Sequence, residues 1–318
     1  MITLLASWRQ RLSLIRRQQG NHNYKLYTIN YQLRNYKLYT INYTLLLLGL
    51  LVACGEQPES FTHDVVLSYT PVKQQGESQL CWVYAMLAAI ETEHIGRGDS
   101  VCLSPAFVAR SLHADSIAAK QQRGMAATLI SLIGRYGVVP FDAMPSLDWP
   151  LPHKAFMFGV EYTPQEFGRS VCAPGEYVAL TSRDDHPYYK EVELPLADNW
   201  THERFLNLPA DSLLRLAGRA VRERHGVCWE GDTGDPGFDW QHGVARLTLL
   251  SKASKVSDDH CMAIVGLAHD AQGDPFFIMK NSWGTNNAYG GLLYMSFDYF
   301  VRNTVSVVLP RSLVENEN

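Results

Sequence analysis

The spacing of hydrophobic and polar positions changes near residue 147. Before that point, the apolar runs are long enough for helices and end at glycine or ahead of proline. Such runs predict buried helices, because glycine readily ends a helix and proline cannot continue one. The predicted helices are 81–95, closed by Gly96, then 104–111, opened by Pro105, and 125–135, stopped near Gly137. Ser78 is the expected N-cap of the first helix.

Beyond residue 147, the apolar runs are short and rich in β-branched or aromatic residues, with Gly, Pro, Asn and Asp between them. This pattern is typical of strands. The expected strands are 177–181, 226–229, 261–267, 276–280, 292–297 and 305–309, and one helix, 209–223, interrupts them. A helical half followed by an antiparallel β half predicts an α+β fold. A cleft between such halves is a common place for an active site.

The first 53 residues have the pattern of a targeting segment. Asn23–Tyr31 recurs as Asn35–Tyr43, which we interpret as a duplicated stretch upstream of the true start. The apolar run Leu45–Cys54 follows basic residues and is shorter than the roughly 20 residues that a membrane-spanning helix needs. We therefore expect residues 1–53 to be a signal segment that is removed.

The composition narrows the classes of function. A chain of 318 residues with 46% hydrophobic content can bury one or two compact domains. The formal net charge of -4, without a basic run, gives no electrostatic support for a nucleic-acid partner. The six cysteines include no Cys-x-x-Cys pair, so a zinc ribbon or a thioredoxin-type site has no support. We expect no metal and no cofactor.

One cysteine stands at a position that favours a reactive thiolate. Cys81 begins the first predicted helix, and the positive end of the helix dipole stabilises a thiolate there. A single cysteine is nevertheless more often an inert buried residue than a nucleophile. A histidine on an apolar strand, such as His260, is likewise usually a core residue. The assignment therefore depends on the segments around them.

Three segments resemble those that carry the active site of the papain superfamily of cysteine peptidases. They are Gln75–Trp82, Asp259–Gly266 and Lys280–Gly284, in the family's chain order of cysteine, histidine and asparagine. The separation between Cys81 and His260 exceeds the roughly 130–150 residues of papain itself, which implies an insertion.

The resemblance implies a role for each matched residue. Cys81 would be the nucleophile, His260 its acid–base partner, and Asn281 the group that orients the imidazole. Gln75 would donate to the oxyanion together with the N–H of Cys81, with Gln74 as the alternative if the alignment shifts by one. Trp283 would shield the bond between histidine and asparagine from water, and Trp82 is a further supporting residue.

The resemblance also implies the fold and the domains. We expect a papain-like, two-lobed domain over 65–310, with the active site in the cleft between its lobes. The helical lobe would cover about 75–145, and an antiparallel, β-barrel-like lobe about 147–310. Residues 311–318 would be a tail. The implied activity is hydrolysis of peptide bonds in a peptide or protein substrate, without a metal or cofactor.

A second resemblance concerns the N-terminus. Leu51–Cys54 resembles the lipobox of bacterial lipoproteins. It implies that Cys54 becomes the first residue and carries a lipid, so the protein is anchored to a membrane without spanning it. Residues 54–64 would then be a tether. The implied location is a bacterial cell envelope, at the periplasmic face or the cell surface, where up to two disulfides of unknown pairing are possible.

Other segments are similar to the bleomycin hydrolase and aminopeptidase C branch of the superfamily. They are Tyr136–Pro140, Thr163–Phe167 and Cys228–Gly234, and with the active-site segments they cover about 70–308. The chain as a whole therefore resembles a shortened, lipoprotein form of this branch.

The chain departs from that branch at two places. Most of the branch's helical insertion is missing, because only Pro145–Val160 is available for it. The branch's C-terminal arm, which enters the cleft and makes the enzyme an aminopeptidase, would have to be built from Pro310–Asn318. We therefore expect an open cleft, endopeptidase activity and a monomer. An aminopeptidase of bleomycin hydrolase type is the alternative.

Two further alternatives keep the fold and change the function. One is a lipid-anchored binding protein with a decayed site, against which the full set of Gln75, Cys81, His260 and Asn281 argues. The other is a transferase or amidase, which would use the same nucleophile with a different acceptor.

Overall fold

The computed structural model describes residues 58–114, 123–157, 159–251 and 257–315. The predictions for the signal segment, for Cys54 and for its lipid lie outside these residues. Within the described part of the chain, no helix is long and apolar enough to cross a membrane.

Three helices form the first part of the domain, as the hydrophobic pattern predicts. They are α3 (Cys81–Gly96), α4 (Pro105–Ala114) and α5 (Ala126–Tyr136). Helix α3 is buried on almost every side from Cys81 to His94, which explains why its sequence has no polar stripe. The expected N-cap is wrong. The N-cap is Leu80, without a side-chain hydrogen bond, because the hydroxyl of Ser78 donates instead to the carbonyl of Gln75, at 2.7 Å, in the turn before the helix.

The helical part extends beyond residue 147, where the sequence placed its end. Helix α6 (Pro164–Val171) begins with a capping box between Thr163 and Glu166 and has proline at its first position. It packs against α5, and a Cβ on Gly168 would lie 3.2 Å from the side chain of Ile133. The 3₁₀ turn η2 (Phe141–Ala143) and the hairpin of β2 (Ala155–Met157) and β3 (Val160–Tyr162) precede α6. The boundary between the parts therefore follows α6.

The second part is built on a sheet of 11 strands within the described residues. The six predicted strands are β4 (Tyr177–Thr181), β7 (Val227–Gly231), β10 (His260–His269), β11 (Pro275–Lys280), β12 (Leu292–Ser296) and β13 (Thr304–Pro310). The pattern missed β1 (Thr62–Val66), β5 (Lys190–Glu193), β6 (Arg204–Asn207), β8 (Phe238–Asp239) and β9 (Val244–Ala245). The strand order is β5-β6-β4-β13-β7-β10-β11-β12-β9-β8, and β1 pairs with β10.

This sheet corrects the expectation of an antiparallel, barrel-like lobe. Strands β4 and β6 pair in parallel, as do β9 and β12, so the sheet is mixed. Its order ends at β5 on one side and β8 on the other, so it does not close into a barrel. The α+β class itself is confirmed.

Strand β10 changes partners along its length. Its first half, from His260 to Ile264, pairs with β7, and its second half, from Gly266, pairs with β1. A bulge between Ile264 and Gly266 bends the strand, and a Cβ on Gly266 would lie 2.5 Å from the carbonyl oxygen of Val65. The bend lets the first half of β10 face α3.

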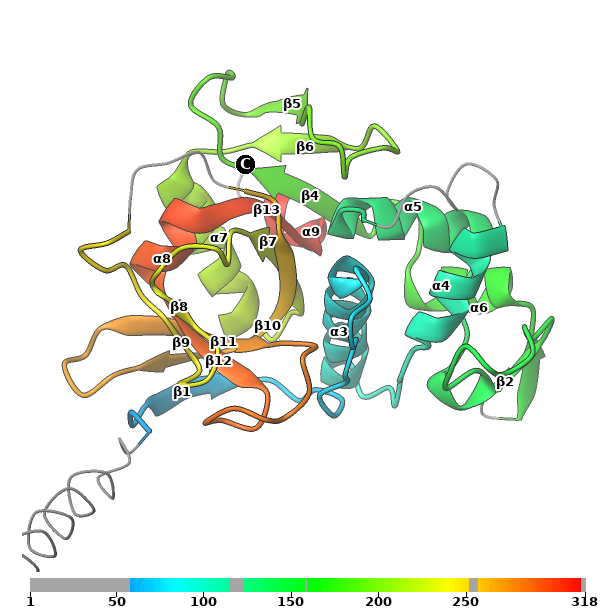
Figure 1. Ribbon diagram of the computed structural model, residues 1–318. Coiled ribbons are helices and arrows are strands. Elements are labelled where there is room, and N and C mark those ends of the chain that lie inside the picture. The colour runs from blue at the N-terminus through cyan, green and yellow to red at the C-terminus, as the bar shows by residue number, and fades with distance from the viewer. Residues whose placement is uncertain (1–57, 115–122, 158, 252–256, 316–318) are drawn as a thin grey trace, which may run out of the picture. The chain divides into compact units, whose positions relative to one another are not determined.

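Figure 1 shows α3 between the sheet and the group of α4, α5 and α6. Helix α3 approaches β7 closely, since a Cβ on Gly226 would lie 2.1 Å from the carbonyl oxygen of Ala89. Trp82 is buried in the core around α3. On the opposite side of the sheet, α7 (Ala210–Arg222) and α8 (Phe297–Asn303) contribute to a second core.

Both ends of the described chain are held against the fold. Near the start of the described chain, the carbonyl of Glu59 accepts from the hydroxyl of Tyr289 at 2.6 Å, and Phe61 stacks on Tyr294 before β1 begins. The predicted tail, 311–318, is not free over its first residues. They include α9 (Ser312–Glu315), whose Leu313 is buried against α7.

Candidate active site

The structure brings the predicted nucleophile and its predicted base together. Cys81 is the first residue of α3 and His260 the first residue of β10, and both side chains are buried. The sulfur of Cys81 receives hydrogen bonds from the thiol of Cys261, from the imidazole of His260 and from the backbone N–H of Cys261. These bonds and the charge of His260 lower the pKa of Cys81 to about 4, although burial opposes the shift.

Asn281 holds the far side of the imidazole. Its side-chain oxygen lies 2.7 Å from Nε2 of His260, and both residues are buried. Asn281 directly follows β11, whose antiparallel pairing with β10 brings it beside the start of that strand. The same oxygen accepts from the N–H of Ser282 at 2.7 Å, which fixes the amide. Since Nε2 is engaged by Asn281, Nδ1 is the ring nitrogen available to Cys81.

Aromatic rings cover this histidine. The ring of Trp283 lies 4.3 Å from that of His260, and Trp240 and Phe238 meet Trp283 edge-on at 5.3 and 6.0 Å. The cover limits the access of water to the bond between His260 and Asn281. The sequence predicted Trp283 here. Trp240 and Phe238 come from the short strand β8 and the turn after it, which the pattern missed.

Gln75 is joined to the loop that carries Asn281. Its side-chain oxygen accepts from the hydroxyl of Ser282 at 2.6 Å, its side-chain nitrogen donates to the carbonyl of Ser78 at 2.8 Å, and its backbone N–H donates to the carbonyl of Ser282 at 2.8 Å. The side-chain nitrogen carries a second hydrogen that these bonds do not use. Gln74, the alternative, instead accepts from the N–H of Gly76 at 3.1 Å. Trp82 lies in the core, behind the nucleophile.

A buried carboxylate connects the segments that carry these residues. Glu91, on α3, accepts from Lys73 at 2.6 Å and from the N–H of Leu103 at 2.7 Å, and it also accepts from the hydroxyl of Thr70. Lys280 donates to Thr70 at 2.8 Å, and burial lowers the pKa of Lys280 to about 8. The carboxylate thereby fixes the loop before Gln75 and the end of β11 relative to α3.

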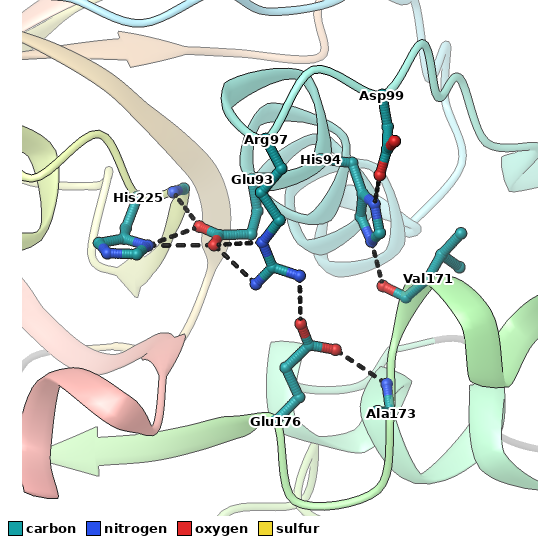
Figure 2. A network of polar contacts seen from close by, with 9 residues as sticks. Glu93, His94, Arg97, Asp99, Val171, Ala173, Glu176 and His225 are labelled. Carbon is teal, nitrogen blue, oxygen red and sulfur yellow. Dashed lines mark hydrogen bonds and ion pairs between the residues drawn. The ribbon is translucent and has the colours of Figure 1, made fainter.

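The other end of α3 has its own polar network (Figure 2). Glu93 accepts from the N–H of Gly226 at 3.1 Å and pairs with His225 at 3.0 Å and with Arg97 at 2.8 Å, while Arg97 also pairs with Glu176 at 2.9 Å. Glu93 lies roughly 18 Å along the helix from Cys81, at about 1.5 Å per residue. The network joins α3 to the start of β7 and to the segment before β4. It is too distant to contact the sulfur of Cys81.

Sequence reasoning missed a pair of acidic side chains beside the site. Glu230 is buried on β7 and accepts from the hydroxyl of Ser306 at 2.7 Å. Asp258 interacts with Glu230, and burial raises the pKa of Asp258 to about 6. The sequence could have pointed to Glu230, because it is a carboxyl residue in an otherwise apolar strand. Within the described residues, no group of His, Cys, Asp and Glu could hold a metal ion.

The acidity of Cys81 predicts selective alkylation at low pH. A thiol with a pKa near 4 is already thiolate at pH 5.5, whereas burial raises the pKa of Cys102, Cys172, Cys228 and Cys261 above the usual value. Iodoacetamide at pH 5.5 is therefore expected to label Cys81 and none of these four cysteines. The labelling rate should fall as the pH drops through 4, because the thiolate is then protonated.

Peptide mapping by mass spectrometry measures this labelling. Denatured protein at pH 8.5 is the control, in which all cysteines react. Equal labelling of several cysteines in the folded protein at pH 5.5 would contradict an activated thiolate.

Comparisons with known proteins agree with this arrangement. The chain is 27% identical over 177 residues to aminopeptidase W of Lactobacillus delbrueckii subsp. lactis, and 26% identical over 162 residues to aminopeptidase G of the same organism. These matches cover 49% and 45% of the chain but only 40% and 37% of the relatives, so the chain spans about two fifths of their length. The crystal structure of PepW from Lactobacillus rhamnosis HN001 superposes with a TM-score of 0.62 at 16% identity, over 94% of this chain and 96% of that one, which shows a shared fold.

The family assignment comes from a family model. The model of the Peptidase C1-like family matches residues 152–318, which is more than half of the chain. This region contains His260 and Asn281, and the sequence resemblance to papain-like peptidases near the aminopeptidase branch is confirmed. The chain belongs to the Peptidase C1-like family.

Proposed function

We propose that the protein is a cysteine peptidase that hydrolyses peptide bonds through an acyl-enzyme. The observation that carries this proposal is the continuous line of contacts from Cys81 through His260 to Asn281. A nucleophile, a base and a group that orients the base are the parts that acyl transfer requires.

Each residue has a defined task in the reaction. The thiolate of Cys81 attacks the carbonyl carbon, and the imidazolium of His260 gives its proton to the leaving amine. His260 then takes a proton from water, which attacks the thioester and releases the acid. The N–H of Cys81 and the unused side-chain hydrogen of Gln75 are the donors for the oxyanion, and removing one such donor typically costs about 10²–10³-fold in kcat.

We further propose that the enzyme is an endopeptidase, as the sequence led us to expect. This proposal is supported by the position of the described C-terminal residues. The N–H of Arg311 donates to the carbonyl of Glu176 at 2.8 Å, and Glu176 pairs with Arg97 at the end of α3 opposite to Cys81. At about 1.5 Å per residue, the length of α3 separates this point from the sulfur by roughly 24 Å. The described C-terminal residues, up to Glu315, therefore lie away from Cys81, which supports an endopeptidase.

An internally quenched peptide with an acetylated N-terminus tests the choice between endopeptidase and aminopeptidase. We expect cleavage at internal bonds, at rates within about tenfold of the same peptide with a free amine, because no described residue of the tail binds an α-ammonium group. Mass analysis of the products locates the bond. Release of single residues from free N-termini only, without cleavage of the acetylated peptide, would support the aminopeptidase activity that the names of the relatives state.

The location and the oligomeric state are proposals from the sequence alone. We propose a monomer anchored through a lipid on Cys54 in a bacterial cell envelope. Because Glu59 is already held on the fold, only a few residues would separate the lipid from the domain.

A further inference from the structure

The catalytic sulfur has a second thiol beside it. Cys261 follows His260 on β10, and its side chain and backbone N–H both hydrogen-bond to the sulfur of Cys81. Both cysteines belong to the same buried core, and neither is in a disulfide. The proposed peptide hydrolysis uses His260 and Asn281 but assigns no step to the thiol of Cys261.

The sheet fixes the position of Cys261. It lies directly across from Glu230 on β7, and Glu230 lies directly across from Ser306 on β13. Helix α3 packs against β10 and β7, and Cys261 belongs to the same core as the buried residues of α3. The position of Cys261 therefore does not depend on a loop.

The two thiols differ in state and in exposure. Cys81 is 8% exposed and Cys261 is 2% exposed, so a small reagent from solvent reaches Cys81 first. Burial and the hydrogen bond to Cys81 raise the pKa of Cys261 well above its usual value, which keeps it a thiol. A thiolate that is oxidised while a protonated thiol waits beside it is the arrangement of a peroxide-sensitive cysteine and its resolving partner.

We propose that Cys261 is the resolving cysteine of Cys81, so that hydroperoxides convert the active site into a reversible Cys81–Cys261 disulfide. The inference rests on the proposed function, since it uses the same activated sulfur. It assigns to the site a second, protective chemistry that peptide hydrolysis does not need.

The chemistry balances in two steps. The Cys81 thiolate attacks one oxygen of hydrogen peroxide, the O–O bond breaks, and the departing hydroxide takes a proton and leaves as water. Cys81 is now a sulfenic acid. The sulfur of Cys261 then attacks the sulfenic sulfur, the S–S bond forms, the S–O bond breaks, and the hydroxide leaves with the proton of Cys261 as a second water. Two thiols are oxidised by two electrons, and one peroxide is reduced to two waters.

Oxidation of Cys81 also prepares Cys261 for the second step. Burial, the largest cause of the raised pKa of Cys261, remains, but the hydrogen bond to the Cys81 thiolate and the charge of that thiolate, which also hold the proton on Cys261, disappear when Cys81 becomes an uncharged sulfenic acid. Without a resolving thiol, the sulfenic acid would proceed to sulfinic and sulfonic acids, which dithiothreitol does not reduce. The disulfide therefore keeps the nucleophile recoverable.

Cys228 provides a matched control. It is fully buried on β7, on the same face of the sheet as Glu230, and it is free. It pairs with Ala263, two positions farther along β10 than Cys261, which places it roughly 7 Å farther from the start of that strand. Its thiol donates to the carbonyl of Trp229 at 3.9 Å, so Cys228 is a buried thiol of the same core with a different hydrogen-bond partner.

The experiment treats the reduced whole chain with hydrogen peroxide, denatures it at pH 8.5 in iodoacetamide so that every remaining thiol is blocked, and maps the peptides by mass spectrometry. In the wild type we expect a peptide pair linked through Cys81 and Cys261, while Cys102, Cys172 and Cys228 are alkylated. Dithiothreitol should restore the free thiols and, with them, activity. Cys228→Ala should behave as the wild type does.

Cys261→Ala should lose this protection. Cys81 should then carry sulfinic or sulfonic acid, and the fraction of the variant's own untreated activity that dithiothreitol recovers should be at least about fivefold lower than the fraction recovered in the wild type. Cys261→Ser, which keeps the volume and the hydrogen-bond donor, gives the same readout if the alanine variant folds poorly. The mapping needs no peptide hydrolysis, so a chain that forms the disulfide but cuts no peptide would refute the proposed function and leave this inference standing. A wild-type Cys81 that becomes sulfinic acid while Cys261 remains alkylatable, or that links to Cys228, would overturn it.

Discussion

Cys81→Ala is expected to lower kcat for peptide hydrolysis by about 10⁴–10⁶-fold, the range seen when a protease loses its nucleophile. The substitution removes the only atom that forms the acyl-enzyme. The fold should persist, because alanine fills most of the volume of cysteine at the start of a helix whose other buried residues are unchanged. Steady-state cleavage of a quenched peptide measures the loss, and circular dichroism with thermal unfolding measures the fold.

Cys172→Ala is the matched control for this variant. Cys172 is a buried, free cysteine in the same core, and it follows α6 near the far end of α3. Its removal should change kcat/KM by less than about twofold, since surface and core changes away from the reacting groups leave transition-state contacts intact. Residual activity of folded Cys81→Ala within tenfold of the wild type would rule out Cys81 as the nucleophile.

His260→Ala is expected to cost nearly as much as Cys81→Ala, again about 10⁴–10⁶-fold in kcat. The imidazole does two things that alanine cannot do. Its hydrogen bond and charge help to keep Cys81 ionised, and it carries the proton to the leaving amine. Because the two residues act as a unit, the double variant Cys81→Ala/His260→Ala should be no less active than either single variant.

Asn281→Ala separates orientation from reaction. The amide holds the ring through the 2.7 Å contact with Nε2 but exchanges no proton, so its loss should cost less, about 10²-fold. Initial rates over pH 4–9 check this order, because a ring that has lost its orientation changes the pH profile as well as the maximum rate. A folded Asn281→Ala variant as inactive as Cys81→Ala would mean that the amide does more than orient the histidine.

Much of the candidate site can be predicted from the sequence. Cys81, His260 and Asn281 stand in three segments whose order and neighbours resemble one family, and the structure places their side chains in one line of contacts. The core helices were also predictable, because each is a continuous apolar run ended by a local signal such as Gly137. The capping box at Thr163 and Glu166 is a further local signal in the sequence, and it marks the start of α6.

Only the tertiary structure decided the remaining features. Strands β5, β6, β8 and β9 have only two to four residues, and the residues of β1 are mostly exposed. Such strands gain their stability from the partner beside them and not from their own residues. The mixed and open form of the sheet likewise depends on partners, because pairing between segments distant in the sequence sets the direction of each strand. Nothing local marks Cys261 as a neighbour of the nucleophile.

The contact between Cys261 and Cys81 joins residues far apart in the chain. The sequence by itself determined the reactive groups, because the type of residue and the short segment around it are enough to identify them. The bend of β10 between Ile264 and Gly266 and the close approach of Gly226 to Ala89 are tertiary features of the contact between the sheet and α3. Packing in a dense core depends on all its neighbours at once, so this part of the site could be known only after the fold.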